Sequence, residues 1–339
     1  MKITIKDIAD ASGVSRGTVD RVLHNRQGVS PENREAVLKT LEELNYRPDS
    51  VAKALATRKC PKTVHVIVAP TFNPFVDEIL EGIRRAESDY ADYGLRVRIH
   101  ALSAFDRNEQ LLLLQDIMNE GCDGLALVPV ASTAITNAIN NISESGIPVV
   151  IYNSEMPDAK SICFVGQDQF KSGQTAGALM NMAVGKGQVC IILAMADLSC
   201  HQSRMKGFKS ELCADISIYS VDNNDDKDEL AYRAAMRFLE ESNNTIDGIY
   251  ITGGGIAGLI RALEEKQLAG KVKVISHDIT PIAQNFLNSG ALLFTLGQDP
   301  QFQGYKSVSV LFDYLYRGIL PEQKCIYTNI DIKMKTNIN

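Results

Sequence analysis

The sequence predicts an N-terminal all-α domain followed by an α/β domain made of two lobes with parallel sheets. Two observations predict this division. Residues 1–47 show three short amphipathic helices separated by turns, whereas residues 61–339 alternate between strand-like and helical segments. The length of 339 residues, 45% of them hydrophobic, is enough for two or three domains with substantial cores.

The charge is distributed unevenly along the chain. The formal net charge of −6 argues by itself against a nucleic-acid partner. Residues 1–59, however, contain 11 Lys and Arg against 8 Asp and Glu, a net charge of +3, which leaves −9 for the other residues. The acidic balance therefore disfavours nucleic acid only for the C-terminal part.

Start and stop signals define the helices of the first domain. Thr4 and Asp7 form a capping box for a helix that ends at Gly13, and Ser15 begins a second helix after a short turn. A third helix begins at Pro31. The apolar residues of this third helix are Val37, Leu38, Leu41 and Leu44. Two short helices joined by a glycine-containing turn, with a third that closes the core, indicate a helix-turn-helix domain.

The second helix of such a domain enters the major groove of DNA with its N-terminal residues at the base edges. Arg16 and Arg21 have the geometry to donate two hydrogen bonds each to guanine, and Thr18 to contact a phosphate or a thymine methyl group. Thr4 and Ser15 stand at helix N-termini, where the hydroxyl, the backbone N–H groups and the helix dipole favour a phosphate. These five residues are the expected DNA contacts of the domain.

The first sixty residues resemble the lactose-repressor (LacI) family of transcription regulators. The shared pattern is I-x-D-I-A-x-x-S-G-V-S-x-x-T-V-x-R-V-L over residues 5–23, followed by L-N-Y-R-P over residues 44–48. The resemblance implies that residues 48–60 are a hinge that folds into a short helix on operator DNA, with Ala52 among the DNA contacts and Leu55 as a wedge in the minor groove. Gly17, Asp20 and His24 depart from the family pattern, so the operator sequence does not follow from the resemblance.

Strand-like segments alternate with amphipathic helices in the rest of the chain. The segments are 63–69, 96–102, 124–129, 148–152, 162–165, 188–193, 216–221, 248–252, 272–276 and 293–297. Such alternation favours parallel sheets with helices on both faces, and this number of strands favours two sheets of about five or six strands.

Polar and aromatic residues follow several of these strands. Because ligands of open α/β sheets bind at the carboxyl ends of the strands, the loops there should carry a ligand site. Amides, carboxylates, an arginine and phenylalanine rings that converge in a cleft suit a small polyhydroxylated ligand. The expected site residues are Phe72, Asn73, Phe75, Asn153, Asp168, Arg204, Thr252, Asp278 and Gln298.

The order of these segments over residues 62–333 resembles the ribose-type periplasmic sugar-binding proteins, whose fold the effector domains of the LacI family share. The resemblance implies a two-lobed type I periplasmic-binding-protein-like fold, in which Phe72 and Phe75 pack on a sugar and the polar residues hydrogen-bond it. Val76, Ser154 and the pair Gly253-Gly254 depart from the pattern, which affects the identity of the ligand rather than its class.

A glycine-rich segment supports an alternative ligand. Residues 253–258 fit the G-x-G-x-x-G pattern of dinucleotide-binding loops, and Asp278 follows Gly258 by 20 residues. A regulator that senses a dinucleotide or a purine is therefore the alternative to a sugar sensor. Against it, this pattern normally lies in the first βα unit of a domain, whereas several strands precede it here.

Signals for other classes of protein are absent. The sequence has no Ser/His/Asp arrangement, no H-E-x-x-H motif and no Walker loop, and its five His and seven Cys show no metal-ligand spacing. We therefore expect no enzyme activity, metal or cofactor. No apolar run is long enough for a membrane span and no secretory signal is recognisable, so we expect a cytoplasmic location.

The sequence thus predicts a DNA-binding transcription regulator, a repressor, whose operator affinity is controlled by a small sugar or polyol between two lobes. The expected domains are residues 1–47, 48–60 and 61–339. The expected lobes are 61–157 with 292–321, and 158–291 with 322–339, with crossings near 155–160, 290–293 and 320–323. A two-fold homodimer should bind a pseudo-palindromic operator. Effector and operator affinities should change by the same factor, with a sign that the sequence leaves open.

Overall fold

The computed structural model describes residues 5–23, 28–44, 60–71, 74–196 and 198–338. The chain divides into two compact units, Met1–Lys59 and Cys60–Asn339. The described part of the first unit is all α and that of the second is α/β, as the sequence predicts.

Three helices form the described part of the first unit: α1 (Ile5–Ser12), α2 (Arg16–Leu23) and α3 (Pro31–Glu43). Gly13 follows α1 with a φ of +71°, a left-handed conformation that glycine adopts without strain. Ser15 caps α2, because its Oγ accepts a hydrogen bond from the backbone N–H of Thr18 at 3.1 Å.

The core of this unit is formed by one face of each helix. Its buried apolar residues are Ile8, Ala9, Val19, Val22 and Val37. Leu38 does not join this core, contrary to the prediction, and is 52% exposed. The helical repeat turns the position after Val37 toward solvent, and Thr40 is buried instead with its hydroxyl donating to the carbonyl of Ala36 at 2.9 Å.

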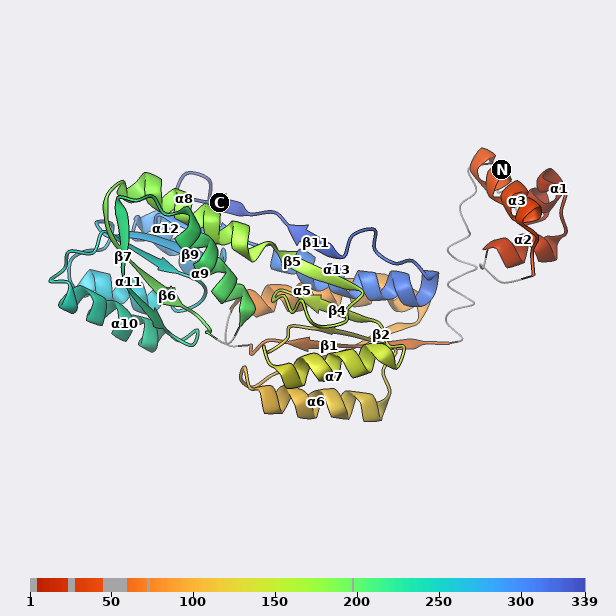
Figure 1. The fold of residues 1–339 in the computed structure, drawn as a ribbon, viewed down its shortest axis with the longest axis horizontal. Coiled ribbons are helices and arrows are strands. Elements are labelled where there is room, and N and C mark those ends of the chain that lie inside the picture. The colour runs from red at the N-terminus through yellow and green to blue at the C-terminus, as the bar shows by residue number, and fades with distance from the viewer. Residues whose placement is uncertain (1–4, 24–27, 45–59, 72–73, 197, 339) are drawn as a thin grey trace. The chain divides into compact units, whose positions relative to one another are not determined.

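The second unit contains two six-stranded sheets, one in each lobe (Figure 1). The first sheet has the order β11-β5-β4-β3-β1-β2 and the second the order β12-β10-β9-β8-β6-β7. The first comprises β1 (Lys62–Val68), β2 (Leu95–Ala101), β3 (Gly124–Leu127), β4 (Val149–Tyr152), β5 (Cys163–Gln167) and β11 (Cys325–Thr328). The second comprises β6 (Gly187–Leu193), β7 (Ile216–Asn223), β8 (Gly248–Ile251), β9 (Lys273–His277), β10 (Phe294–Gly297) and β12 (Asp331–Lys333). Every described pairing is parallel except that of β10 with β12.

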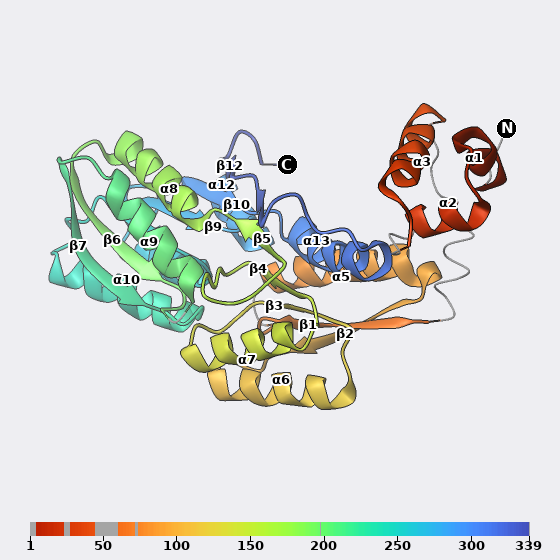
Figure 2. The ribbon, with the colours of Figure 1, turned by 45° about the vertical axis from the view of Figure 1, so that its right-hand side comes forward.

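Helices cover both faces of each sheet (Figure 2). In the first lobe, α5 (Pro74–Tyr90) and α13 (Pro300–Phe312) pack on one face, and α6 (Arg107–Glu120) and α7 (Thr133–Glu144) on the other. In the second lobe, α8 (Gln169–Val184) and α9 (Ser199–Glu211) pack on one face. The opposite face carries α10 (Asp228–Glu241), α11 (Ile256–Glu265) and α12 (Pro281–Ser289). Short helical turns follow α5 at Ala91–Tyr93 and α13 at Asp313–Arg317.

The chain crosses between the lobes at places other than the predicted ones. β5 pairs with β11 in the first sheet, and β10 pairs with β9 in the second. The crossings therefore follow Gln167, Gly297 and Thr328, and not residues 155–160, 290–293 and 320–323. Pairing between strands that are distant in the sequence decides which lobe a strand joins, and such pairing leaves no mark on local periodicity.

Glycines bring helices of both lobes into very close contact. In the first lobe, a Cβ atom on Gly82 of α5 would lie 2.0 Å from the backbone oxygen of Gln301 in α13. In the second lobe, a Cβ atom on Gly173 of α8 would lie 2.0 Å from the backbone oxygen of Arg204 in α9. Both positions therefore require glycine, and the second contact fixes the backbone that carries Arg204.

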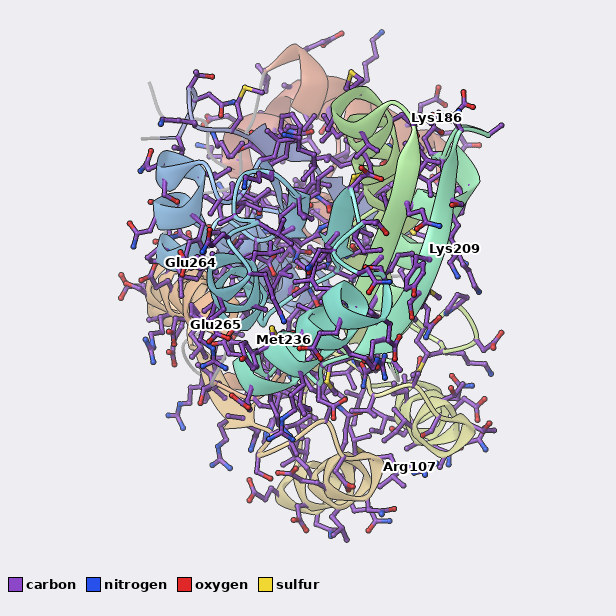
Figure 3. The ribbon with its side chains drawn as sticks, turned by 90° about the vertical axis from the view of Figure 1, so that its left-hand side faces the viewer. Arg107, Lys186, Lys209, Met236, Glu264 and Glu265 are labelled. Atoms are coloured by element: carbon purple, nitrogen blue, oxygen red, sulfur yellow. The ribbon has the colours of Figure 1, made fainter. Side chains whose placement is uncertain are left out.

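Charged side chains of both signs surround the second lobe. In Figure 3, Lys186 and Lys209 lie on one side of this lobe and Glu264 and Glu265 on the opposite side, and all four are exposed. Among the described residues, no helix is both long and apolar enough to cross a lipid bilayer.

Candidate ligand site and nucleic-acid interface

Two adjoining cavities lie between the lobes and share Phe75, Asp278 and Gln298. The inner cavity, of about 40 Å³, is enclosed by first-lobe residues such as Asn153 and second-lobe residues such as Arg204. The outer cavity, of about 560 Å³, extends past the crossings to the first turns of α5 and α12. The predicted position of the site, at the carboxyl ends of the strands, agrees with both cavities.

Arg204 is the most buried charged side chain of the cleft, with 2% exposure. It is held on α9, where its Nε donates to Oε1 of Gln169 and its Nη1 to the backbone oxygen of Thr252, both at 2.7 Å. Two neutral acceptors thus orient the guanidinium, and its charge acts on the ionisable groups around it.

Asp278 and Gln298 form a second polar pair of the site. Asp278 follows β9 with a φ of +72°, and its Oδ1 accepts a hydrogen bond from Nε2 of Gln298 at 2.7 Å. Burial raises the pKa of Asp278, while Arg204 and the bond from Gln298 oppose that rise. The left-handed backbone turns this carboxyl group into the cleft instead of along the strand.

Asn153 brings the first lobe into the same network. It follows β4 with a φ of +63°, a conformation that asparagine tolerates better than most residues. Its Nδ2 lies 3.3 Å from Oε1 of Gln303 and 3.5 Å from Oε1 of Gln298. The cleft therefore joins amides of the first lobe to ionisable groups of the second.

His201 lines the inner cavity and was not among the predicted site residues. Its Nδ1 lies 3.1 Å from both the backbone oxygen and Oγ1 of Thr252. Burial, and then the nearby Arg204, lowers the pKa of His201 to about 3, so the imidazole is neutral. The sequence does contain a signal for His201 as a site residue. His201 precedes Arg204 by three residues in the same helix, and residues at this spacing share a helix face.

Two predicted site residues have local structural partners instead. Oδ1 of Asp168 accepts from the backbone N–H of Lys171 at 3.0 Å and caps α8. Oγ1 of Thr252 accepts from the backbone N–H of Ala194 at 3.0 Å in a fully buried position. Neither residue is among the described residues that line the two cavities. Phe72 and Asn73 lie outside the described residues.

The glycine loop before α11 is filled by side chains of the protein itself. The backbone N–H of Gly254 donates to Oδ1 of Asp226 at 2.7 Å, and that of Gly258 to Oδ1 of Asp228 at 3.2 Å. A Cβ atom on Gly258 would lie 1.7 Å from the backbone oxygen of Asp228. Because carboxylates occupy the amides where a pyrophosphate would bind, the glycines are explained by packing and the dinucleotide alternative is not favoured.

The expected DNA-reading helix presents its polar residues outward. Arg16 and Arg21 of α2 are exposed and Thr18 is half-buried, while Val19 and Val22 of the same helix are buried in the core. Three further expected DNA contacts, Thr4, Ala52 and Leu55, lie outside the described residues.

Comparisons with known proteins agree with this architecture. Residues 64–318 match the periplasmic binding protein domain, and residues 4–49 match the bacterial regulatory proteins of the lacI family. The chain therefore belongs to the family built on the periplasmic binding protein domain, and it carries a LacI-family DNA-binding domain at its N-terminal side.

Individual relatives include both regulators and binding proteins. Catabolite control protein A of Priestia megaterium is 33% identical over 153 residues, which cover 44% of this chain and 43% of that protein. The ribose operon repressor of Haemophilus influenzae is 29% identical over 62% of this chain and 60% of that protein. The matched region thus spans about half the length of these regulators. The crystal structure of the glucose-galactose binding protein GanP from Geobacillus stearothermophilus shares the fold, with a TM-score of 0.76 at 21% identity over 82% of this chain and 99% of that one.

Proposed function

We propose that this protein is a transcription regulator, acting as a repressor, whose affinity for operator DNA is controlled by a small sugar or polyol bound between the two lobes. The observation that carries the proposal is the convergence of Arg204, Asp278, Gln298, Asn153 and Phe75 on one cleft in a chain with a helix-turn-helix domain. A relative named as the ribose operon repressor supports the same class.

The chemistry of the cleft suits a polyol. Each hydroxyl group of such a ligand needs a donor and an acceptor, which Asn153, Gln298 and Asp278 can supply in pairs. The Phe75 ring, on the wall of both cavities, can pack on the C–H face of a sugar ring. The inner cavity of about 40 Å³ is smaller than a monosaccharide, so the ligand extends into the outer cavity of about 560 Å³.

The proposed mechanism is thermodynamic linkage. An effector that binds the closed lobes better than the open ones shifts the population toward closure, and operator affinity changes by the same factor. We further propose a cytoplasmic homodimer on a pseudo-palindromic operator, with Arg16, Thr18 and Arg21 at the bases, Thr4 and Ser15 at phosphates, and Ala52 and Leu55 in the hinge. Phe72 and Asn73 complete the proposed effector set, whereas Asp168 and Thr252 hold the fold behind it. No catalytic step is part of this function.

A ligand screen combined with operator binding tests the proposal. Thermal unfolding of the whole protein is followed with D-ribose, D-arabinose, D-glucose, D-galactose and NADH, because a ligand at 100 times its Kd adds about 2.7 kcal/mol of stability. Operator fragments are then titrated with and without the stabilising compound. Stabilisation by NADH alone, or by a sugar that leaves operator affinity unchanged, would contradict the proposal.

Variants assign the two halves of the mechanism. Asp278→Ala should abolish the effector response and leave operator binding intact. The matched control is Asp222→Ala, a partly exposed carboxylate of the same lobe that pairs with Arg237 at 2.6 Å and lines neither cavity.

Leu55→Ala should weaken specific operator binding far more than non-specific binding, whereas equal losses would exclude the wedge.

A further inference from the structure

Two buried glutamines lie behind the cleft without being among the described residues that line its cavities. Gln169 is 3% exposed and Gln303 is fully buried. Each lies near the start of a helix that follows a crossing between the lobes, Gln169 in α8 of the second lobe and Gln303 in α13 of the first. A buried amide needs partners for both its donor and its acceptor, so the hydrogen bonds of these side chains show what they hold.

Gln169 joins the second lobe to the first. Its Oε1 accepts from Nε of Arg204 at 2.7 Å, and Arg204 belongs to α9 of the second lobe. Its Nε2 donates to the backbone oxygen of Asn153 at 3.2 Å, at the end of β4 in the first lobe, and lies 3.5 Å from Oε1 of Gln298. One amide thus holds a side chain of one lobe and the backbone of the other.

Gln303 closes the network from the first lobe. Its Nε2 donates to the backbone oxygen of Gln298 at 2.7 Å, and its Oε1 accepts from Nδ2 of Asn153 at 3.3 Å. Gln298 stands at the second crossing and holds Asp278 of the second lobe through its side chain. Four of the predicted site residues, Asn153, Arg204, Asp278 and Gln298, are therefore linked through the two glutamines.

We propose that Gln169 and Gln303 are positioning residues that hold the effector-contact side chains of the two lobes in one hydrogen-bonded unit, so that contact geometry and lobe closure change together. Amides suit this role because each presents a donor and an acceptor without burying a charge. Gln169 lies two residues after the crossing at Gln167, so rotation of α8 about this crossing changes the orientation of its amide toward the Asn153 carbonyl of the first lobe. The inference rests on the proposed function for the role of the contacts, whereas lobe closure can be measured without DNA or sugar.

Distances between the lobes of the full-length protein test the proposal. Spin labels are attached through a keto amino acid at Leu112 of α6 and Met182 of α8, which are 62% and 75% exposed on different lobes, so that the native cysteines stay untouched. In Gln169→Met and Gln303→Met, the ratio of the closed to the open population should fall about fivefold, the fold-change of one net hydrogen bond. Gln110→Met is the matched control, because the side chain of buried Gln110 bonds to Val128 and Val130 of its own lobe.

A second variant separates positioning from folding. Gln169→Glu keeps an acceptor for Arg204 but loses the donor to the Asn153 carbonyl, so it should open the lobes. Thermal unfolding of each variant is followed in parallel, so that opening is distinguished from loss of the folded state. The proposal would be overturned if the distances between the spin labels stayed unchanged in all three variants. It would also be overturned if Gln110→Met shifted these distances equally, or if the wild-type distance distribution were as broad as that of the variants. If the proposed function is wrong, the result is different: no sugar stabilises the protein or changes its operator affinity, while the distances between the spin labels still change as expected.

Discussion

The two lobes share one plan but contribute different chemistry to the cleft. Each has a six-stranded sheet, a glycine-packed helix pair and two histidines whose pKa values are lowered by burial. In the first lobe, His65 and His100 hydrogen-bond each other at 2.9 Å between β1 and β2, and neither lines the cleft. In the second lobe, the histidines are His201, at the inner cavity, and His277, next to Asp278.

This difference separates two tasks. The buried ionisable groups at the cleft, Arg204, His201 and Asp278, belong to the second lobe, whereas the first lobe offers Asn153, Phe75 and the half-buried Glu78. The chain, however, enters the first lobe directly after the DNA-binding unit, at β1. A signal that begins at Arg204 must therefore pass between the lobes, through the crossings or through contacts such as the Gln169–Asn153 hydrogen bond, before it reaches the lobe that continues into the DNA-binding unit.

Loss of the buried charge should have the largest effect. Arg204→Met leaves Oε1 of Gln169 and the backbone oxygen of Thr252 without their donor, and should cost about 4 kcal/mol of unfolding free energy together with the effector response. Arg237→Met removes an arginine of the same lobe that is half-exposed and paired with Asp222, and should cost about 0.5 kcal/mol. Urea unfolding followed by circular dichroism measures both values, and equal losses would refute the burial argument.

The two helix pairs should prove equally intolerant of a methyl group. Gly82→Ala and Gly173→Ala each place a Cβ atom 2.0 Å from a backbone oxygen, so each should cost about 3 kcal/mol. Only the second change displaces the backbone of Arg204 directly. If only one of the two variants lost stability in urea unfolding, the two helix pairs would differ in how closely their backbones pack.

Acid should destabilise the protein through its neutral histidines. Because the pKa of His201 is about 3 when folded and near 6.5 when unfolded, the unfolded state binds the extra proton between these values, and stability falls as the pH falls. Between pH 6.5 and 5 the loss from this residue should be about 2 kcal/mol. The raised pKa of Asp278 acts in the opposite direction, so the measured quantity is the difference between wild type and His201→Gln.

His65→Gln provides the matching variant in the first lobe. It should also reduce the acid sensitivity of unfolding, since burial and His100 lower the pKa of His65. It should leave the pH dependence of effector binding unchanged, whereas His201→Gln should alter it. The measurement is calorimetric titration with the sugar identified by the screen, at pH 5.5 and 7.5. If the Kd of both variants depended on pH in the same way, the proposed division of tasks between the lobes would be contradicted.

Helix caps should give the smallest effects. Ser132 caps α7 in the first lobe and Thr280 caps α12 in the second, through hydroxyl oxygens 3.2 and 3.3 Å from backbone N–H groups. Ser132→Ala and Thr280→Ala should each cost about 1 kcal/mol. Only Thr280 lines the outer cavity, so only Thr280→Ala should also change the Kd for the effector. A change in Kd for Ser132→Ala would place the ligand elsewhere.

Local features of the sequence were sufficient to predict much of the fold. The cap at Ser15, the glycine at position 13 and the alternating strands are encoded in a few neighbouring residues each, and the structure confirms them. The assignment of β5, β10 and β11 to a lobe was wrong, because it depends on pairing between distant segments.

The candidate site was predictable in position but less so in composition. Residues directly after a strand, such as Asn153 and Asp278, line the cleft as predicted. Asp168 occupies an equivalent place but caps its own helix, and a carboxylate at a helix start does not reveal which role it takes. Gln169 and Gln303 resemble ordinary surface glutamines in the sequence, and only tertiary contacts show that they are buried.

The crossings also determine the order in which the protein can be completed during synthesis. The first sheet includes β5, which ends at residue 167, and β11, which ends at residue 328, so it lacks its edge strand until the second lobe has been translated. At about 5–20 residues per second, that interval lasts roughly 8–30 s. The DNA-binding unit, by contrast, precedes both lobes in the sequence and leaves the ribosome before them. A nascent chain would thus possess a reader of DNA well before it possesses a finished sensor.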